Sequence, residues 1–138
     1  MYKNPADTRA FFDKIGALIE RSLQCEVVIC PPYLDIETAV VAARGLIIQL
    51  GAQTLYWEKE GAFTGEVSGP MIKAAGCSHA IVGHSERRQY FGETNESVSK
   101  KTIAAIEAGL TPIVCVGERE NRHVEKVLIE QFHDSIGS

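Results

Sequence analysis

The residues best suited to chemistry form one polar run at positions 83–88, with the sequence GHSERR. His84 follows the apolar residues of a short strand pattern and precedes the start of a helix, so its side chain should project from a strand end toward open space. If the ring lies against the first turn of that helix, the positive end of the helix dipole disfavours imidazolium. The neutral ring can then donate a hydrogen bond to an oxyanion that develops on a substrate. The alternative interpretation is a surface histidine beside a structural ion-pair cluster of Glu86, Arg87 and Arg88.

A second candidate is the segment at positions 57–67, which is long for a connection between a strand and a helix. Its tip combines an aromatic residue, Phe63, with Gly61 and Gly65. Loops of this length often carry function, and this one either folds over its own domain or inserts into a partner. The alternative is a mobile surface excursion with Phe63 packed onto the core.

Signatures of cofactor and metal sites are missing from the sequence. The glycines form neither G-x-G-x-x-G nor a P-loop. The four cysteines contain no C-x-x-C pair and have no histidines at zinc spacing. His79 and His84 point to opposite faces of a strand, which is wrong for sharing a metal ion. We therefore expect no cofactor, no metal and no disulfide, and a reducing cytoplasm as the location.

The composition is typical of a soluble globular protein, because 45% of the 138 residues are hydrophobic and 23% are charged. Lys and Arg number 14 against 18 for Asp and Glu, which gives a net charge of -4. A nucleic-acid partner is not expected without a basic surface. No apolar run reaches the roughly 18 residues that a membrane span needs, and the N-terminus has no apolar signal core. With no linker or composition shift, we expect a single domain over residues 1–138.

Helical and strand patterns alternate along the chain. Strands are predicted at residues 26–30, 50–56, 80–82 and 111–116, the first of them buried on both faces of a parallel sheet. Helices are predicted from Pro5 around an apolar stripe that ends at Ile19, then at about 35–43, 68–76, 94–109 and 124–133. The predicted N-caps are Asn4, Asp35, Ser68 and either Thr94 or Asn95. The last helix has an apolar face at Val124, Val127, Leu128 and Phe132.

This order predicts an α/β fold with four parallel strands and flanking helices. Both a free-standing doubly wound sheet and half of a (β/α)8 barrel fit the pattern, and periodicity does not choose between them.

Five sequence runs in register resemble the triosephosphate isomerase family. They are GAQ at 51–53, YWEK at 56–59, GAFTGEVS at 61–68, GHSERRQYFGET at 83–94 and CVGE at 115–118. The resemblance implies a partial (β/α)8 barrel that contains the family's second to fifth strands. It also implies interconversion of dihydroxyacetone phosphate and glyceraldehyde 3-phosphate through an enediolate, without metal or cofactor.

Individual roles follow from the resemblance. His84 corresponds to the electrophile that polarises the substrate carbonyl, Glu86 to a carboxylate beside it, and Ser85 to a neighbour of the site. Thr64 corresponds to the residue that inserts into the neighbouring subunit of a dimer, with Phe63 and Gly65 beside it at the loop tip. Glu66 and Arg87 correspond to a pair that meets across that interface.

The family's catalytic glutamate, its first-strand Asn and Lys, and its main phosphate-binding loops have no counterpart in the sequence. We therefore expect negligible isomerase activity from the isolated chain. Half a barrel exposes two strand edges, at residues 27–29 and 113–114, so we expect a homo-oligomer that completes the barrel by self-association. Three hypotheses remain open: an isomerase completed by another chain, a non-catalytic self-associating fragment, and a small module that binds a phosphate ligand. The turn at 119–124 is also shorter than is usual in the family.

Overall fold

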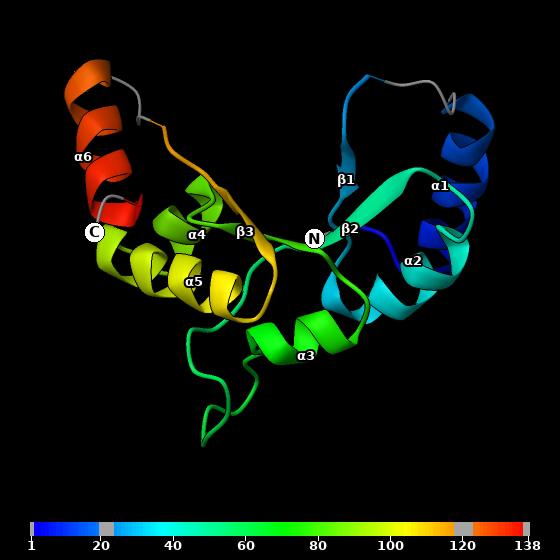
Figure 1. Cartoon of the computed structure of the whole chain (residues 1–138), viewed down its shortest axis with the longest axis horizontal. Helices are drawn as coiled ribbons and strands as arrows, with labels where there is room; N and C mark the ends of the chain where they lie inside the picture. The colour runs from blue at the N-terminus through cyan, green and yellow to red at the C-terminus, as the bar shows by residue number, and fades with distance from the viewer. Residues whose placement is uncertain (1, 20–23, 118–122, 137–138) are drawn as a thin grey trace.

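The computed structural model describes residues 2–19, 24–117 and 123–136. Within them, one parallel sheet runs in chain order through β1 (Val27–Ile29), β2 (Ile48–Ala52), β3 (His79–Val82) and β4 (Thr111–Val114). The sheet curls into part of a barrel with helices on its outer side (Figure 1). This geometry decides between the two folds that the sequence left open, in favour of the partial barrel.

Helices connect and flank the strands, as right-handed crossovers between parallel strands require. They are α1 (Pro5–Leu18), α2 (Ile36–Ala42), α3 (Gly69–Ala74), α4 (Ser85–Tyr90), α5 (Asn95–Glu107) and α6 (Val124–Ile136), with a 3-10 turn at Tyr33–Asp35. The helices α1 and α2 pack against each other beside β1 and β2, while α5 and α6 pair beside β3 and β4 (Figure 1).

The core lies between the sheet and these helices. Alternate residues of β2 point into it, so Ile48 and Leu50 are buried whereas Gln49 is exposed. Phe12 of α1 and Val98 of α5 fill the core from the helical side. The sheet and helices thus form one continuous apolar cluster that holds the strand ends in place.

Two predicted helix caps are confirmed. The Asn4 side chain accepts hydrogen bonds from the backbone N–H groups of Ala6 and Asp7, at 3.0 and 3.1 Å. Thr94 caps α5 by accepting from the Ser97 N–H at 3.2 Å. Both sites are capping boxes, which satisfy the free N–H groups of a first helical turn.

Asp35 and Ser68 occupy the N-cap positions of α2 and α3 as predicted, but neither side chain makes a capping hydrogen bond. The Asp35 side chain makes no capping bond to α2 and instead accepts a hydrogen bond from the Thr8 hydroxyl at 2.7 Å, in the buried contact between α1 and the start of α2. Ser68 precedes α3 but its side chain does not cap it. In both positions burial against the rest of the fold competes with the local cap geometry.

Three further expectations need correction. The first strand is only half-buried, because β1 has a neighbour on one side alone within the described residues. The second strand ends at Ala52 and not at residue 56, since its pairing with β3 stops there. The predicted apolar face of α6 is only partly covered, since Val127 and Leu128 are half-buried but Val124 and Phe132 are exposed, Phe132 at 58%.

No helix within residues 2–19, 24–117 or 123–136 is long and apolar enough to cross a membrane. The predicted short turn at 119–124 falls mostly outside the residues that the structure describes.

Candidate active site

A cavity of about 650 Å³ opens at the carboxyl ends of β3 and β4. Its walls come from the end of β3, from α4 and the turn that follows it, from the first residue of α5, from the loop after β4 and from one side of α6. His84, Ser85, Arg88 and Cys115 are among the lining residues. Ligands of parallel α/β proteins bind at this end of the strands, so the cavity is the candidate active site.

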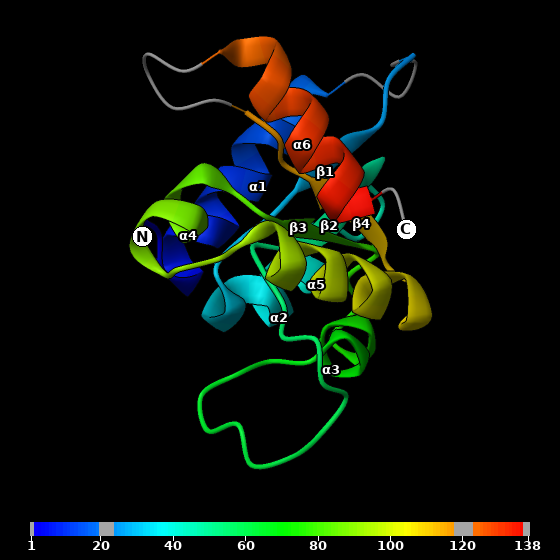
Figure 2. The ribbon, with the colours of Figure 1, turned by 90° about the vertical axis from the view of Figure 1, so that its left-hand side faces the viewer.

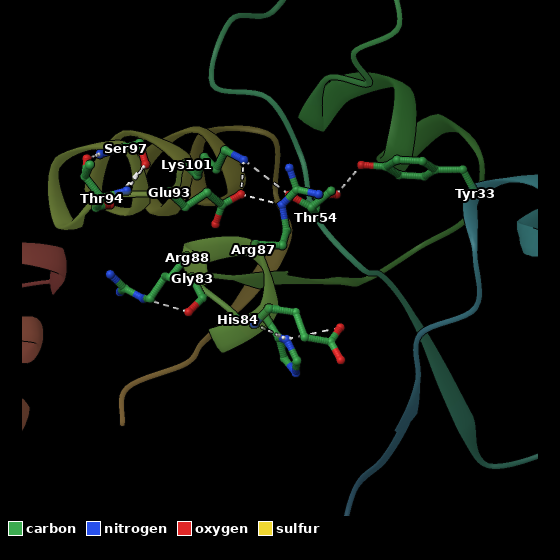
Figure 3. Close-up of polar contacts among 11 residues, drawn as sticks. Tyr33, Thr54, Gly83, His84, Arg87, Arg88, Glu93, Thr94, Ser97 and Lys101 are labelled. Carbon is green, nitrogen blue, oxygen red and sulfur yellow. Dashed lines mark hydrogen bonds and ion pairs between the residues drawn. The ribbon is translucent and has the colours of Figure 1, made fainter. Parts of the chain in front are cut away.

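His84 occupies the N-cap position of α4, where its ring contacts the backbone of the first helical turn. The ring Nδ1 accepts a hydrogen bond from the Glu86 N–H at 3.3 Å. An accepting Nδ1 must carry a lone pair, so the neutral ring has its proton on Nε2. Figure 3 shows the ring at the start of α4. The side chain is 44% exposed and lines the cavity. The ring can therefore donate a hydrogen bond from Nε2 to a ligand.

Gly83 forms the sharp turn between the end of β3 and His84, the N-cap residue of α4. Its φ of 72° lies in the left-handed region, which favours glycine. A Cβ at this position would also lie 3.0 Å from side-chain atoms of Val98 and Arg88. Both facts make glycine the residue that allows His84 to face the cavity.

Ser85 and Glu86 occupy different positions relative to the cavity. Ser85 lines it from the first position of α4. Glu86 does not line it: its side chain is 74% exposed, and one carboxylate oxygen lies 3.8 Å from Nδ1 of His84. The contact between Glu86 and the His84 ring is thus made mainly through the Glu86 backbone N–H. The catalytic roles of these two residues stay predictions.

A charge cluster of Arg87, Glu93 and Lys101 adjoins the cavity, which Glu93 also lines (Figure 3). One Glu93 carboxylate oxygen accepts hydrogen bonds from Arg87 Nε at 2.5 Å and from Lys101 Nζ at 2.6 Å. Lys101 also donates to the Thr54 hydroxyl at 3.3 Å. The Glu93 and Lys101 side chains are each only 5% exposed. The cluster joins α4, α5 and the segment after β2.

Burial and hydrogen bonding oppose each other at Glu93. Burial acts to raise the pKa of its carboxyl, but the hydrogen bonds and charges of Lys101 and Arg87 outweigh burial and hold the pKa below its usual value. Sequence reasoning missed Glu93 and Lys101 as site-supporting residues. A signal existed for Lys101, because it shares the buried face of α5 with Val98 and Ala105, where a lysine needs a partner.

The long loop after β2 projects away from the sheet, beyond α3 (Figure 2). Tyr56 stacks on Trp57 with ring centroids 4.2 Å apart, and Phe63 lies 4.7 Å from the Tyr56 ring. Phe63 therefore packs within its own loop and leaves part of its ring exposed. Thr64, Gly65 and Glu66 are exposed at the tip.

Arg87, the residue expected to meet Glu66 across an interface, is engaged elsewhere in this chain. Besides its bond to Glu93, its guanidinium lies 4.7 Å from the centroid of the Phe91 ring. The predicted interface residues thus lie in two separate regions, the loop tip and α4. A contact between Glu66 and the Arg87 of a second chain stays a prediction.

Among the described residues, no group of three or more His, Cys, Asp and Glu side chains could hold a metal ion. His79 is buried beside Ser78, 2.8 Å from its hydroxyl, and 3.4 Å from a carboxylate oxygen of Glu26. All four cysteines are free thiols. Burial raises the pKa of Cys30 to about 11, and burial is also the main cause of the raised pKa of Cys115 at the cavity wall.

Comparisons with known proteins agree with this geometry. A family model described as triosephosphate isomerase matches residues 1–137. The triosephosphate isomerase of Solibacter usitatus (strain Ellin6076) is 60% identical over 140 residues, which cover 99% of this chain and 56% of that protein. That of Trichlorobacter lovleyi (strain ATCC BAA-1151 / DSM 17278 / SZ) is 48% identical over the same shares. The crystal structure of triosephosphate isomerase from Bartonella henselae matches with a TM-score of 0.89 and 35% identity, over 98% of this chain and 58% of that one. The chain thus spans about half the length of the curated relatives it matches.

Proposed function

Because this chain belongs to the triosephosphate isomerase family, we propose that it supplies the electrophilic part of a site that interconverts dihydroxyacetone phosphate and glyceraldehyde 3-phosphate. The observation that carries the proposal is the His84 ring, which accepts at Nδ1 from the Glu86 N–H and lines the cavity at the strand ends. Triose phosphate is accordingly the proposed substrate.

In the proposed mechanism, Nε2–H of His84 donates a hydrogen bond to the substrate carbonyl oxygen. When a base removes a proton from the adjacent carbon, negative charge develops on that oxygen, and the hydrogen bond stabilises it. A neutral histidine acting in this way is the family's known chemistry, carried over here with the resemblance. Ser85 and Glu86 are proposed to shape the site around the ring.

The base itself has no proposed counterpart among residues 1–138. We therefore propose that these residues alone have negligible isomerase activity, since a positioned base commonly contributes about 10² to 10⁴ in rate. The share of the relatives that this chain covers, 56%, supports this part of the proposal.

The test is an isomerase assay of the chain alone and of the chain co-expressed with the unmatched part of the Solibacter usitatus relative. We expect activity only in the complemented sample, and a fall of about 10²- to 10³-fold with His84→Gln. His133→Gln, which changes an exposed histidine of α6, is the matched control and should retain activity. Full activity with His84→Gln in the complemented enzyme would overturn the assignment. Activity of the chain alone that His84→Gln abolishes would overturn the inactivity.

A second proposal concerns assembly. We propose that the chain forms a homo-oligomer, with Phe63, Thr64, Gly65 and Glu66 entering a neighbouring copy near its Arg87. The exposed loop tip, held in shape by the stacked Tyr56 ring, supports this arrangement, because a preformed loop loses little conformational entropy on binding.

The two sheet edges offer a further surface for self-association. They support the second candidate function, that of a non-catalytic fragment that associates with copies of itself. Within the described residues, β1 and β4 each pair with one strand only. At the β4 end of the chain, apolar surface is exposed by Ile113 of β4, Val116 just after it and Phe132 of α6. Unpaired edges and apolar patches of this kind favour association.

Sedimentation across micromolar concentrations tests the assembly. We expect a mass above the 15.1 kDa of one chain, and a shift toward monomer with Phe63→Ser. Leu34→Ser removes another exposed apolar side chain, outside the loop, and should leave the mass unchanged. A monodisperse monomer throughout would refute the proposal.

We also propose that residues 1–138 form a single domain and that the protein is located in the cytoplasm. The four free thiols support the cytoplasmic location.

A further inference from the structure

Arg88 joins the loop that carries His84 to the helices behind it. Its Nε donates to the Gly83 carbonyl oxygen at 2.8 Å (Figure 3), and its Nη1 donates to the side-chain oxygen of Asn95 at 2.7 Å. Asn95 is the first residue of α5 and donates in turn to the Asp134 carboxylate of α6 at 3.2 Å. One guanidinium thus holds the end of β3 against the start of α5.

The Gly83 carbonyl belongs to the same planar peptide unit as the His84 nitrogen. A hydrogen bond that fixes the direction of this carbonyl therefore fixes the rotation of the whole peptide plane. That rotation sets the direction of the Cα–Cβ bond of His84, and hence where the ring points. This control matters at Gly83, because a glycine at φ 72° has no side chain of its own to limit its backbone.

The ring needs such support, since its own tether is weak. The bond from the Glu86 N–H to Nδ1 is 3.3 Å long, beyond the usual N–H donor distance of about 2.9 to 3.0 Å. The contact holds the ring only while the backbone at Gly83 and His84 keeps the ring within reach.

Arg88 lines the cavity, but two of its three guanidinium nitrogens are bonded within the protein. Its third nitrogen, Nη2, is buried and has no hydrogen-bond partner among the described residues. Nη2 packs against Gly83, where an added Cβ would lie 3.0 Å away. The guanidinium is therefore used inside the wall of the cavity.

We propose that Arg88 is a positioning residue that sets the orientation and tautomer of the His84 ring through the Gly83 peptide. A planar guanidinium with several donors can reach the Gly83 and Asn95 oxygens at once, whereas a lysine ammonium is a point charge on a flexible stem. Arg88→Lys should thus keep the charge and lose the function. The kinetic part of this proposal rests on the proposed isomerase function, and the spectroscopic part does not.

The spectroscopic test uses the 138-residue chain and the ¹⁵N signals of its histidine rings, with His84→Gln to assign His84. In the wild type we expect one ¹⁵N signal at the shift of a protonated ring nitrogen and one at that of an unprotonated nitrogen. In Arg88→Lys the two signals should move toward each other, because the ring then exchanges between its two tautomers. Arg44→Lys is the matched control, because it makes the same exchange at an exposed arginine outside the site. It should leave the His84 signals in place.

Asn95→Ala is a second variant that tests the proposal if Arg88→Lys does not fold. It removes only the second bond of the guanidinium, and we expect a smaller change of the His84 signals in the same direction. Unchanged His84 signals in a folded Arg88→Lys chain would overturn the proposal. If that variant does not fold, unchanged signals in Asn95→Ala would overturn it.

The kinetic test uses the complemented enzyme. We expect Arg88→Lys to lower kcat by about 10- to 100-fold with a KM within about threefold of wild type, since the residue acts on the reacting geometry and not on substrate binding. An unchanged kcat would overturn the proposal for catalysis. Altered His84 signals with an inactive wild-type complement would support positioning by Arg88 and overturn the isomerase function, so the two failures are distinguishable.

Discussion

Replacing Glu93 with glutamine removes one negative charge from between two cations. In the wild type, Arg87 and Lys101 both donate to the same carboxylate oxygen, at 2.5 and 2.6 Å. Lys101 is the more dependent partner, because its side chain is as deeply buried as that of Glu93. After the change its ammonium keeps the amide oxygen and the Thr54 hydroxyl as acceptors but has lost its counter-charge.

The expected loss of stability is large. Breaking a buried ion pair by removing one partner commonly costs about 3 to 5 kcal/mol, since a buried charge is left uncompensated. At an unfolding entropy of about 2.1 cal/mol/K per residue, 1 kcal/mol corresponds to roughly 3.5 °C in Tm for a chain of this size. We therefore expect Glu93→Gln to lower Tm by about 10 to 17 °C.

Thermal unfolding followed by circular dichroism measures this effect, and a double-mutant cycle with Lys101→Met identifies its cause. The double variant removes both charges, so it should lose less stability than the two single variants added together. Glu96→Gln is the matched control: it disrupts a pair with Lys100 of similar length, 2.7 Å, on the exposed face of α5 and should leave Tm nearly unchanged. Additive losses in the cycle, or equal losses in Glu93→Gln and Glu96→Gln, would refute the reasoning.

Two other predictions follow from the pKa shifts. The folded-state pKa of Glu93 lies below its usual value, because hydrogen bonds from Lys101 and Arg87 outweigh burial. The ionised carboxylate therefore stabilises the fold fully above the ordinary pKa of about 4.3. This stabilisation is lost as the pH falls through the folded-state pKa. Melting curves below about pH 4.5 should show a steeper loss of Tm in wild type than in Glu93→Gln, and parallel losses would contradict this. Burial raises the pKa of Cys30 to about 11, so peptide mapping after brief iodoacetamide treatment should find the exposed Cys25 alkylated well before Cys30, whereas equal labelling of the two would contradict the burial.

The α/β class could be predicted because short apolar runs and amphipathic helical patterns alternate with clear punctuation. All four strands overlap the predicted runs, and β1 and β4 fall wholly within theirs. The end of β2 could not be predicted, since strand-like residues continue past Ala52 through Leu55 and Tyr56. Only pairing with β3 decides where the ladder stops, and that pairing depends on residues nearly thirty positions away.

The site could be predicted where its signal is local. His84 stands at the junction of a strand pattern and a polar turn, and both its N-cap position and its place at the cavity follow from that junction. Glu93 could not be found in the same way, because it lies in a turn without periodicity and its partners, Arg87 of α4 and Lys101 of α5, are brought to it only by the fold. The bond from Arg88 to Gly83 likewise depends on a backbone turn that the residue types alone do not specify.

The helix α4 shows why charged residues support this site. It has six residues and none of them is buried, so apolar packing contributes little to holding it, and helices this short are not stable alone in water. Successive residues of a helix point about 100° apart, so adjacent arginines reach different partners: Arg87 binds Glu93, and Arg88 binds Gly83 and Asn95. The peptide before His84 is therefore held by the polar bonds of Arg88 and not by apolar packing of α4, so removing these bonds should disturb the His84 ring without unfolding the apolar core.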